Sequence, residues 1–226
     1  MRVLSFVTIL WAGTGLFAAK DSPEAERLQR AAEVFREVMD IPDKGIPQGL
    51  LDRAHCVVVV PGLKKGAFIV GAKYGRGFAS CRAQGGVGWT APAAVRIEGG
   101  SFGLQIGGAE SDVILLIMNE RGVQRLLSSK FTLGGDAAVA GGPVGREASA
   151  QTDVYMTAEI LSWSRSRGVF AGLSLTGATL RQDVGTNREL YGKKIENREV
   201  LQGKAQAPAA AGEFISTLNK YSSRKT

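Results

Sequence analysis

Glycine is the feature that most constrains the fold of this chain. The sequence holds 30 glycines among 226 residues, which is about twice the usual share of roughly 7%. They follow no three-residue period of the collagen type. Between them stand short runs of β-branched and apolar residues, which are typical of strands. The glycines therefore predict turns, bulges and close backbone approaches in a strand-rich fold.

The order of these runs predicts the fold class. Strands are expected at residues 55–60, 66–73, 76–82, 93–97, 101–107, 113–118, 154–162, 169–175 and 176–181. Helices are expected at residues 22–40, 47–54, 120–128 and 213–221. Alternating βαβ units are not visible. We expect an α+β fold, with a glycine-rich, mainly antiparallel sheet or barrel-like domain, N-terminal helices and one inserted helix.

The first expected helix carries clear end signals. Ser22 can cap it, and Pro23 suits the first helical position. Leu28, Phe35 and Met39 recur at helical spacing, so one face is apolar. We expect this face to pack on the chain's own domain; insertion into a membrane surface is the alternative.

The beginning of the chain resembles a targeting segment. Arg2 precedes an apolar run over residues 3–17, and Ala18 and Ala19 follow it. This order predicts a secretory signal peptide over residues 1–19, with a retained anchor as the alternative. The domain is then expected over residues 20–200, and residues 201–226 read as an Ala/Pro-rich linker and a short amphipathic helix. The mature chain is expected to be exported, periplasmic or secreted, and peripheral to a membrane.

The two cysteines, Cys56 and Cys81, fall in the first and third expected strands. In a three-stranded meander the outer strands are roughly 9 to 10 Å apart. A disulfide needs Cα atoms within about 7 Å. We therefore expect two buried free thiols, unless a closed barrel changes the neighbours.

The sequence contains few of the residue patterns that catalysis requires. We therefore expect that the chain is not an enzyme and binds no metal and no cofactor. The one histidine, His55, opens an apolar strand and reads as structural. Glu110 and Asp112 would share a strand face; we expect a solvated strand edge or a turn there, with a weak cation site or an acid–base pair as the alternative. The glycine-rich stretch 134–146 lacks the spacing of a nucleotide-phosphate loop.

The charge balance points to anionic partners. The formal net charge is +7 and the pI is near 9.6. Phospholipid headgroups, nucleic acid and acidic polysaccharide would all be attracted, and a modest excess without a specific ligand is the alternative. The sign of the charge does not choose among them.

A series of motifs resembles a known family. These are LLDRAHCVVVVPGLKKGAFIVGAKYGRG, GWTAPAAVRIEGGSFGLQIGGAESDVILLIMNERGV, FTLGGDAAVAGGPVGR, SRSRGVFAGLSLTGATLRQD and NRELYG, which lie within residues 50–192. Together they are similar to the SYLF domain. The resemblance implies non-enzymatic binding of anionic phospholipids, notably phosphoinositides in eukaryotic members. It implies no catalytic residues.

The chain is similar to the stand-alone bacterial form of this domain. We therefore expect an anionic phospholipid surface as its partner, with an envelope protein as the alternative, and no nucleic acid. Actin binding is not expected, because the chain shows none of the SH3 or zinc-finger modules of the actin-binding relatives. The candidate lipid-binding cations are Lys64, Lys65, Lys73, Arg76, Arg146, Arg165 and Arg167.

Overall fold

A computed structural model describes residues 22–42, 45–67, 70–102, 107–145, 157–166, 169–173 and 175–222. The expected signal peptide, Arg146 and Arg167 lie outside the described residues. The helices are α1 (Pro23–Met39), α2 (Gln48–Arg53), α3 (Glu120–Leu126), α5 (Val184–Tyr191), α6 (Asn197–Leu201) and α7 (Gly212–Ser222), with a 3₁₀ turn η2 (Ala209–Ala211). The strands are β1 (Cys56–Ala67), β2 (Val70–Cys81), β3 (Ala93–Phe102), β4 (Gly107–Ile117), β5 (Lys130–Thr132), β6 (Val139–Gly141), β7 (Ile160–Ser166), β8 (Val169–Gly172) and β9 (Thr179–Gln182).

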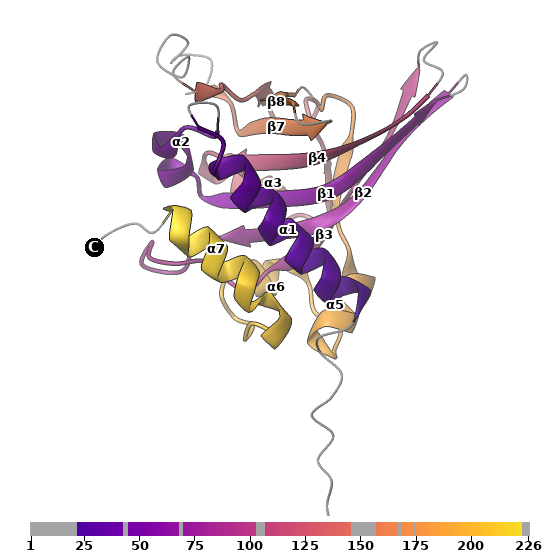
Figure 1. The fold of residues 1–226 in the computed structure, drawn as a ribbon. Coiled ribbons are helices and arrows are strands. Elements are labelled where there is room, and N and C mark those ends of the chain that lie inside the picture. The colour runs from indigo at the N-terminus through magenta and orange to yellow at the C-terminus, as the bar shows by residue number, and fades with distance from the viewer. Residues whose placement is uncertain are drawn as a thin grey trace, which may run out of the picture.

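These strands form one curled sheet, and the helices pack around it (Figure 1). Within the described residues the strand order is β5-β9-β3-β2-β1-β4-β7-β6, and β8 pairs with β7. All neighbours are antiparallel except β6 and β7. The prediction of an α+β fold with a mainly antiparallel, barrel-like sheet is confirmed.

The expected three-strand meander at the start of the sheet is wrong. Residues 56–81 form a single hairpin of two twelve-residue strands, β1 and β2. Pro61 and Gly62 were expected to end a strand, but they form a bulge inside β1. Gly62 has φ of +61°, which lets the chain make the bulge and then continue the pairing.

The prediction of free thiols fails for the same reason. Because β1 and β2 are neighbours, Cys56 and Cys81 are direct cross-strand partners, with Cα atoms 3.9 Å apart. They form a disulfide. The bridge joins the start of β1 to the end of β2, two neighbouring strands at the centre of the sheet.

Both faces of the central strands are buried. Alternate residues of β1 point to opposite faces of the sheet. Val58 and Val60 join the core on the concave face, which α3, α6, β5 and β9 also line. Val57 and Val59 face the convex side, where α1 and α7 cover the sheet. This two-sided burial explains the unbroken apolar run in β1.

The expected N-terminal helix is present and packs on the domain. Ser22 caps α1 by accepting a hydrogen bond from the Ala25 amide at 3.1 Å. Leu28 and Phe35 on its apolar face are fully buried. The helix also contacts α7, where the Phe35 and Tyr221 rings lie edge to face at 6.2 Å. No helix within the described ranges is long and apolar enough to cross a membrane.

Two helices, α5 and α6, were absent from the predicted elements. Their segments lack a regular apolar stripe, and polar side chains hold them to β3. The Ala94 amide donates to Asn187 Oδ1 at 2.8 Å, and Asn197 Nδ2 donates to the Ala94 carbonyl at 3.0 Å. Both asparagines are buried. Periodicity of apolar residues alone does not detect such anchoring.

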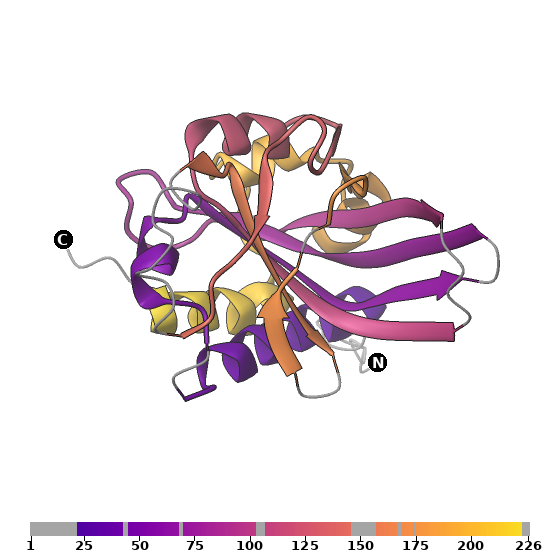
Figure 2. The same ribbon diagram turned by 90° about the horizontal axis from the view of Figure 1, so that it is seen from above.

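The outer halves of β1 to β4 extend beyond the helices as a four-stranded projection (Figure 2). We call this projection the arm; it comprises residues 63–67, 70–75, 98–102 and 107–111. Its strands remain paired in register as far as the hairpin ends. Side chains on the arm therefore stand in defined rows on two faces.

We predict that Gly77→Ala is strongly destabilising. A Cβ at Gly77 would lie 2.0 Å from the Val59 carbonyl oxygen, so the backbones must separate. The free energy of unfolding in urea should fall by roughly 2–3 kcal/mol. Gly66→Ala is the matched control, because its Cβ would meet nothing within 4 Å. Equal effects of the two substitutions would contradict this packing.

The disulfide gives a second prediction. Closing a loop between cysteines 25 residues apart restricts the unfolded chain, which typically adds about 2–4 kcal/mol of stability. The double variant Cys56→Ala, Cys81→Ala should lose that amount, measured by urea unfolding. Mass spectrometry should detect alkylation of the denatured wild-type chain only after reduction. Alkylation without a reductant would show that the thiols are free.

Candidate functional site

The structure distributes the predicted cations over two faces of the sheet. Lys65 and Lys73 are cross-strand partners on the concave face of the arm. Lys64, the neighbour of Lys65 in β1, points to the convex face and stands opposite Glu110. Arg76 also lies on the convex face, nearer the body of the domain. Arg146 and Arg167 lie outside the described residues.

Arg165 has a structural role. It donates to Asp112 Oδ2 from Nε at 3.1 Å and from Nη2 at 2.8 Å, and its third nitrogen pairs with Glu37 of α1. Asp112 also accepts from the Gly62 amide at 3.0 Å. Arg165 therefore ties α1 and β7 to the bulge of β1. Asp112 is occupied by this network and does not form an acid–base pair with Glu110.

The glycine-rich stretch after β5 also has a structural explanation. A Cβ at Gly142 would lie 2.0 Å from the Trp163 ring, so only glycine fits beneath this buried indole. Trp163 Nε1 donates to the Pro143 carbonyl at 3.0 Å. The described part of the GGPVGR motif is thus a close-packing motif.

A row of cations crosses four neighbouring strands on the convex face. Lys130 in β5 pairs with Arg181 in β9, Arg181 with Arg96 in β3, and Arg96 with Arg76 in β2. Directly paired residues point to the same face of a sheet. The four side chains therefore form one basic strip, which we call the cation row.

Two carboxylates pair directly with the cation row. Glu98 binds Arg96 at 2.7 Å and Arg181 at 3.3 Å, and Asp183 lies 3.3 Å from Arg76. No carboxylate in the described part of the chain is within ion-pair distance of Lys130. The row retains a positive excess and remains accessible, since Arg181 and Arg76 are 41% and 40% exposed.

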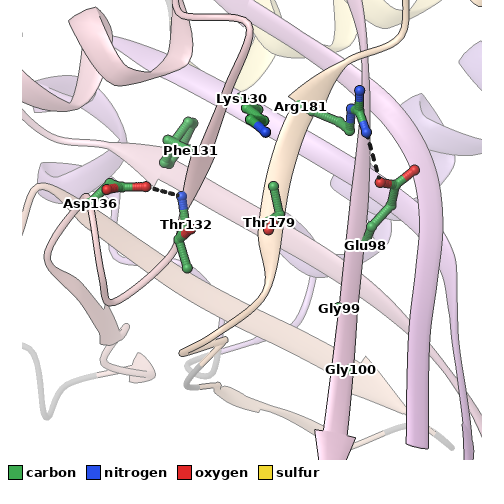
Figure 3. Close-up of a pocket in the computed structure, with 9 residues that line it drawn as sticks. All are labelled: Glu98, Gly99, Gly100, Lys130, Phe131, Thr132, Asp136, Thr179 and Arg181. Carbon is green, nitrogen blue, oxygen red and sulfur yellow. Dashed lines mark hydrogen bonds and ion pairs between the residues drawn. The ribbon is translucent and has the colours of Figure 1, made fainter.

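A surface groove of about 460 Å³ adjoins the cation row. Figure 3 shows Lys130 and Arg181 at one end and Thr132 and Thr179 between the strands. The Thr132 amide donates to Asp136 at 2.7 Å, which holds the pKa of that carboxyl below its usual value. Ammonium, guanidinium and hydroxyl groups suit phosphate and carboxylate oxygens. Among the described residues, no three His, Cys, Asp or Glu side chains gather in a group that could hold a metal ion.

The sequence singled out Arg76 but missed Arg96, Lys130 and Arg181. The alternation of Arg96 with Val95 and Ile97 indicates which face of its strand is polar. It does not indicate that β9 lies between β3 and the three-residue strand β5. The strand order that aligns these cations is a property of the folded sheet.

Comparison with known proteins identifies the family. A family model described as "Ysc84: Las17-binding protein actin regulator" matches residues 98–221, a little over half of the chain. The chain belongs to the Ysc84 family. The predicted membership of the SYLF domain family is thereby confirmed. The matched segment contains two members of the cation row, Lys130 and Arg181, together with Glu98, the ion-pair partner of Arg181.

Relatives in animals and yeast extend this match. SH3 domain-containing YSC84-like protein 1 of Xenopus laevis is 34% identical over 203 residues, covering 87% of this chain and 60% of the relative. The Rattus norvegicus protein of that name is 33% identical over 202 residues, with 87% and 59% covered. Protein YSC84 of Saccharomyces cerevisiae is 30% identical over 198 residues, with 84% and 42% covered. The chain thus spans about 60% or less of these relatives.

These names correct one prediction. We expected actin not to be a partner, because the chain resembles the stand-alone bacterial form. The description of the matching family names a Las17-binding protein and actin regulator. The exclusion of actin is therefore wrong.

Proposed function

We propose that this domain binds anionic phospholipid surfaces through the cation row, as a non-enzymatic peripheral protein. The observation that supports this is the alignment of Lys130, Arg181, Arg96 and Arg76 across four strands of one face. A bilayer presents many phosphates at its surface, and a row of cations across four strands can contact several at once. The adjoining groove offers the Thr179 hydroxyl to one headgroup.

The expected strength of this attachment is modest. Each basic side chain near an anionic membrane contributes about 1 kcal/mol, and the field decays within about 10 Å at ordinary salt. Glu98 and Asp183 reduce the contribution of their partners. Binding should therefore be reversible and weakened by salt. The apolar run that precedes Ala18 and Ala19 supports export to a periplasmic or extracellular membrane surface.

A second candidate is a protein partner in actin regulation. The description of the matching family, which names Las17 binding and actin regulation, favours it. The same basic strip would attract an acidic protein segment as well as a membrane. Phospholipid remains our first proposal because the row crosses four strands and can contact several phosphates of a bilayer.

Vesicle co-sedimentation tests the first proposal. The chain should bind vesicles of equal parts phosphatidylcholine and phosphatidylglycerol, and not vesicles of phosphatidylcholine alone. The double variant Lys130→Gln, Arg181→Gln should weaken binding roughly tenfold, because Lys130 contributes about 1 kcal/mol and Arg181, which is paired with Glu98, contributes less. The matched control is Lys204→Gln, Lys220→Gln, which removes two exposed lysines outside the row.

The outcomes separate the two candidates. Equal losses in the two double variants would mean that net charge, not the cation row, drives attachment. Equal binding to both vesicle types would contradict recognition of anionic lipid. The protein partner would be favoured if the wild-type chain co-sediments with actin filaments but not with vesicles, and if the Lys130→Gln, Arg181→Gln variant no longer co-sediments with the filaments.

A further inference from the structure

The concave face of the arm holds a second, separate group of cations. Lys65 in β1 and Lys73 in β2 are directly opposite each other in the antiparallel pairing. Like charges at such a position repel and destabilise a sheet. Both lysines are half-buried. Burial, together with the charge of Lys73, lowers the pKa of Lys65.

The neighbouring strands place no carboxylate beside this pair. Lys73 is opposite Gly99 in β3, and Lys65 is opposite Ala109 in β4, so the row reads glycine, lysine, lysine, alanine. The nearest acidic residues, Glu98 and Glu110, are offset by one position and point to the convex face. Within the described residues, neither lysine has an ion-pair partner.

A buried hydroxyl stands on the same face. Ser111 lies two residues beyond Ala109 in β4, opposite Leu63 of the concave core. Its side chain is buried, and its Oγ has no hydrogen-bond partner among the described residues. An unsatisfied buried hydroxyl costs free energy and calls for an explanation. Ala178 covers Gly99 beside Lys73, where an added Cβ would lie 3.2 Å from the Ala178 Cα atom, whereas Ala109 beside Lys65 is small and exposed.

We propose that Lys65 and Lys73 form a binding site for a phosphate oxyanion on the concave face of the arm. A phosphate oxygen between the two ammonium groups would replace their repulsion with two charge-assisted hydrogen bonds. Ser111 Oγ lies on the same face toward the domain and is enclosed by protein, so the two lysines carry the site. This site faces away from the cation row and does not depend on the proposed membrane function. A soluble phosphate ester and a lipid headgroup phosphate share this chemistry.

Thermal unfolding of the full chain with inorganic phosphate tests the site. Without phosphate, Lys73→Met should raise the midpoint by about 2 °C, because the repulsion with Lys65 is removed while the aliphatic length is kept. Phosphate should stabilise the wild-type chain more than this variant. Loss of one charge-assisted partner should weaken phosphate binding roughly tenfold or more.

Lys64→Met is the matched control, because Lys64 is adjacent in β1 but faces the other side. The midpoint of this variant should rise with phosphate as much as that of the wild-type chain. The comparison thereby separates binding at the site from the general stabilising effect of phosphate as a salt. Equal phosphate responses of Lys73→Met and Lys64→Met would overturn the site. If Lys73→Met unfolds at a lower temperature than the wild-type chain without phosphate, the repulsion between Lys65 and Lys73 on which the proposed site depends would be contradicted.

Vesicles distinguish the two sources of phosphate. If the ligand is a lipid, Lys73→Met should also weaken binding to vesicles that contain phosphatidic acid, relative to Lys64→Met. If it is a soluble ester, vesicle binding should be the same in both variants while the difference in phosphate response persists. Because the cation row is intact in both variants, failure of this site is distinguishable from failure of the membrane proposal.

Discussion

The register of β1 against its two neighbours is the constraint on which the rest of the structure depends. β1 pairs with β2 and β4 along its whole length, interrupted by the single bulge around Gly62. The Cys56–Cys81 bridge fixes the start of this pairing. Because side chains alternate between faces, a slip of one residue would move every side chain of β1 to the opposite face of the sheet. Lys65 would then join Glu110 on the convex face, and the Lys65–Lys73 pair would disappear.

This register gives the two faces of the sheet different chemistry. On the convex face α1 and α7 cover the centre, while the cation row stays accessible at the β3, β9 and β5 end. On the concave face the core fills the half-barrel, and the arm carries Lys65 and Lys73 beyond it. A broad basic strip suits a surface, whereas a half-buried pair suits one small anionic group.

The sequence predicted those parts that local chemistry determines. The Ser22 cap and the spacing of Leu28 and Phe35 predicted α1 and its docking, and the β-branched runs predicted strands. The order of the strands and the length of the first hairpin could not be predicted from the sequence. Pro61 and Gly62 occur in turns and in bulges alike, so the long hairpin, the disulfide and the Lys65–Lys73 pair were missed together. The cation row depends on strands far apart in the chain.

The most direct test of the account is whether the cation row itself meets an anionic surface. Acetylation of individual lysines can be followed by mass spectrometry in the presence and absence of phosphatidylglycerol vesicles. Lys130 and Lys220 are both exposed, but only Lys130 belongs to the cation row. We predict that vesicles slow acetylation of Lys130 and leave Lys220 on α7 unchanged. Protection of Lys220 without protection of Lys130 would contradict the account.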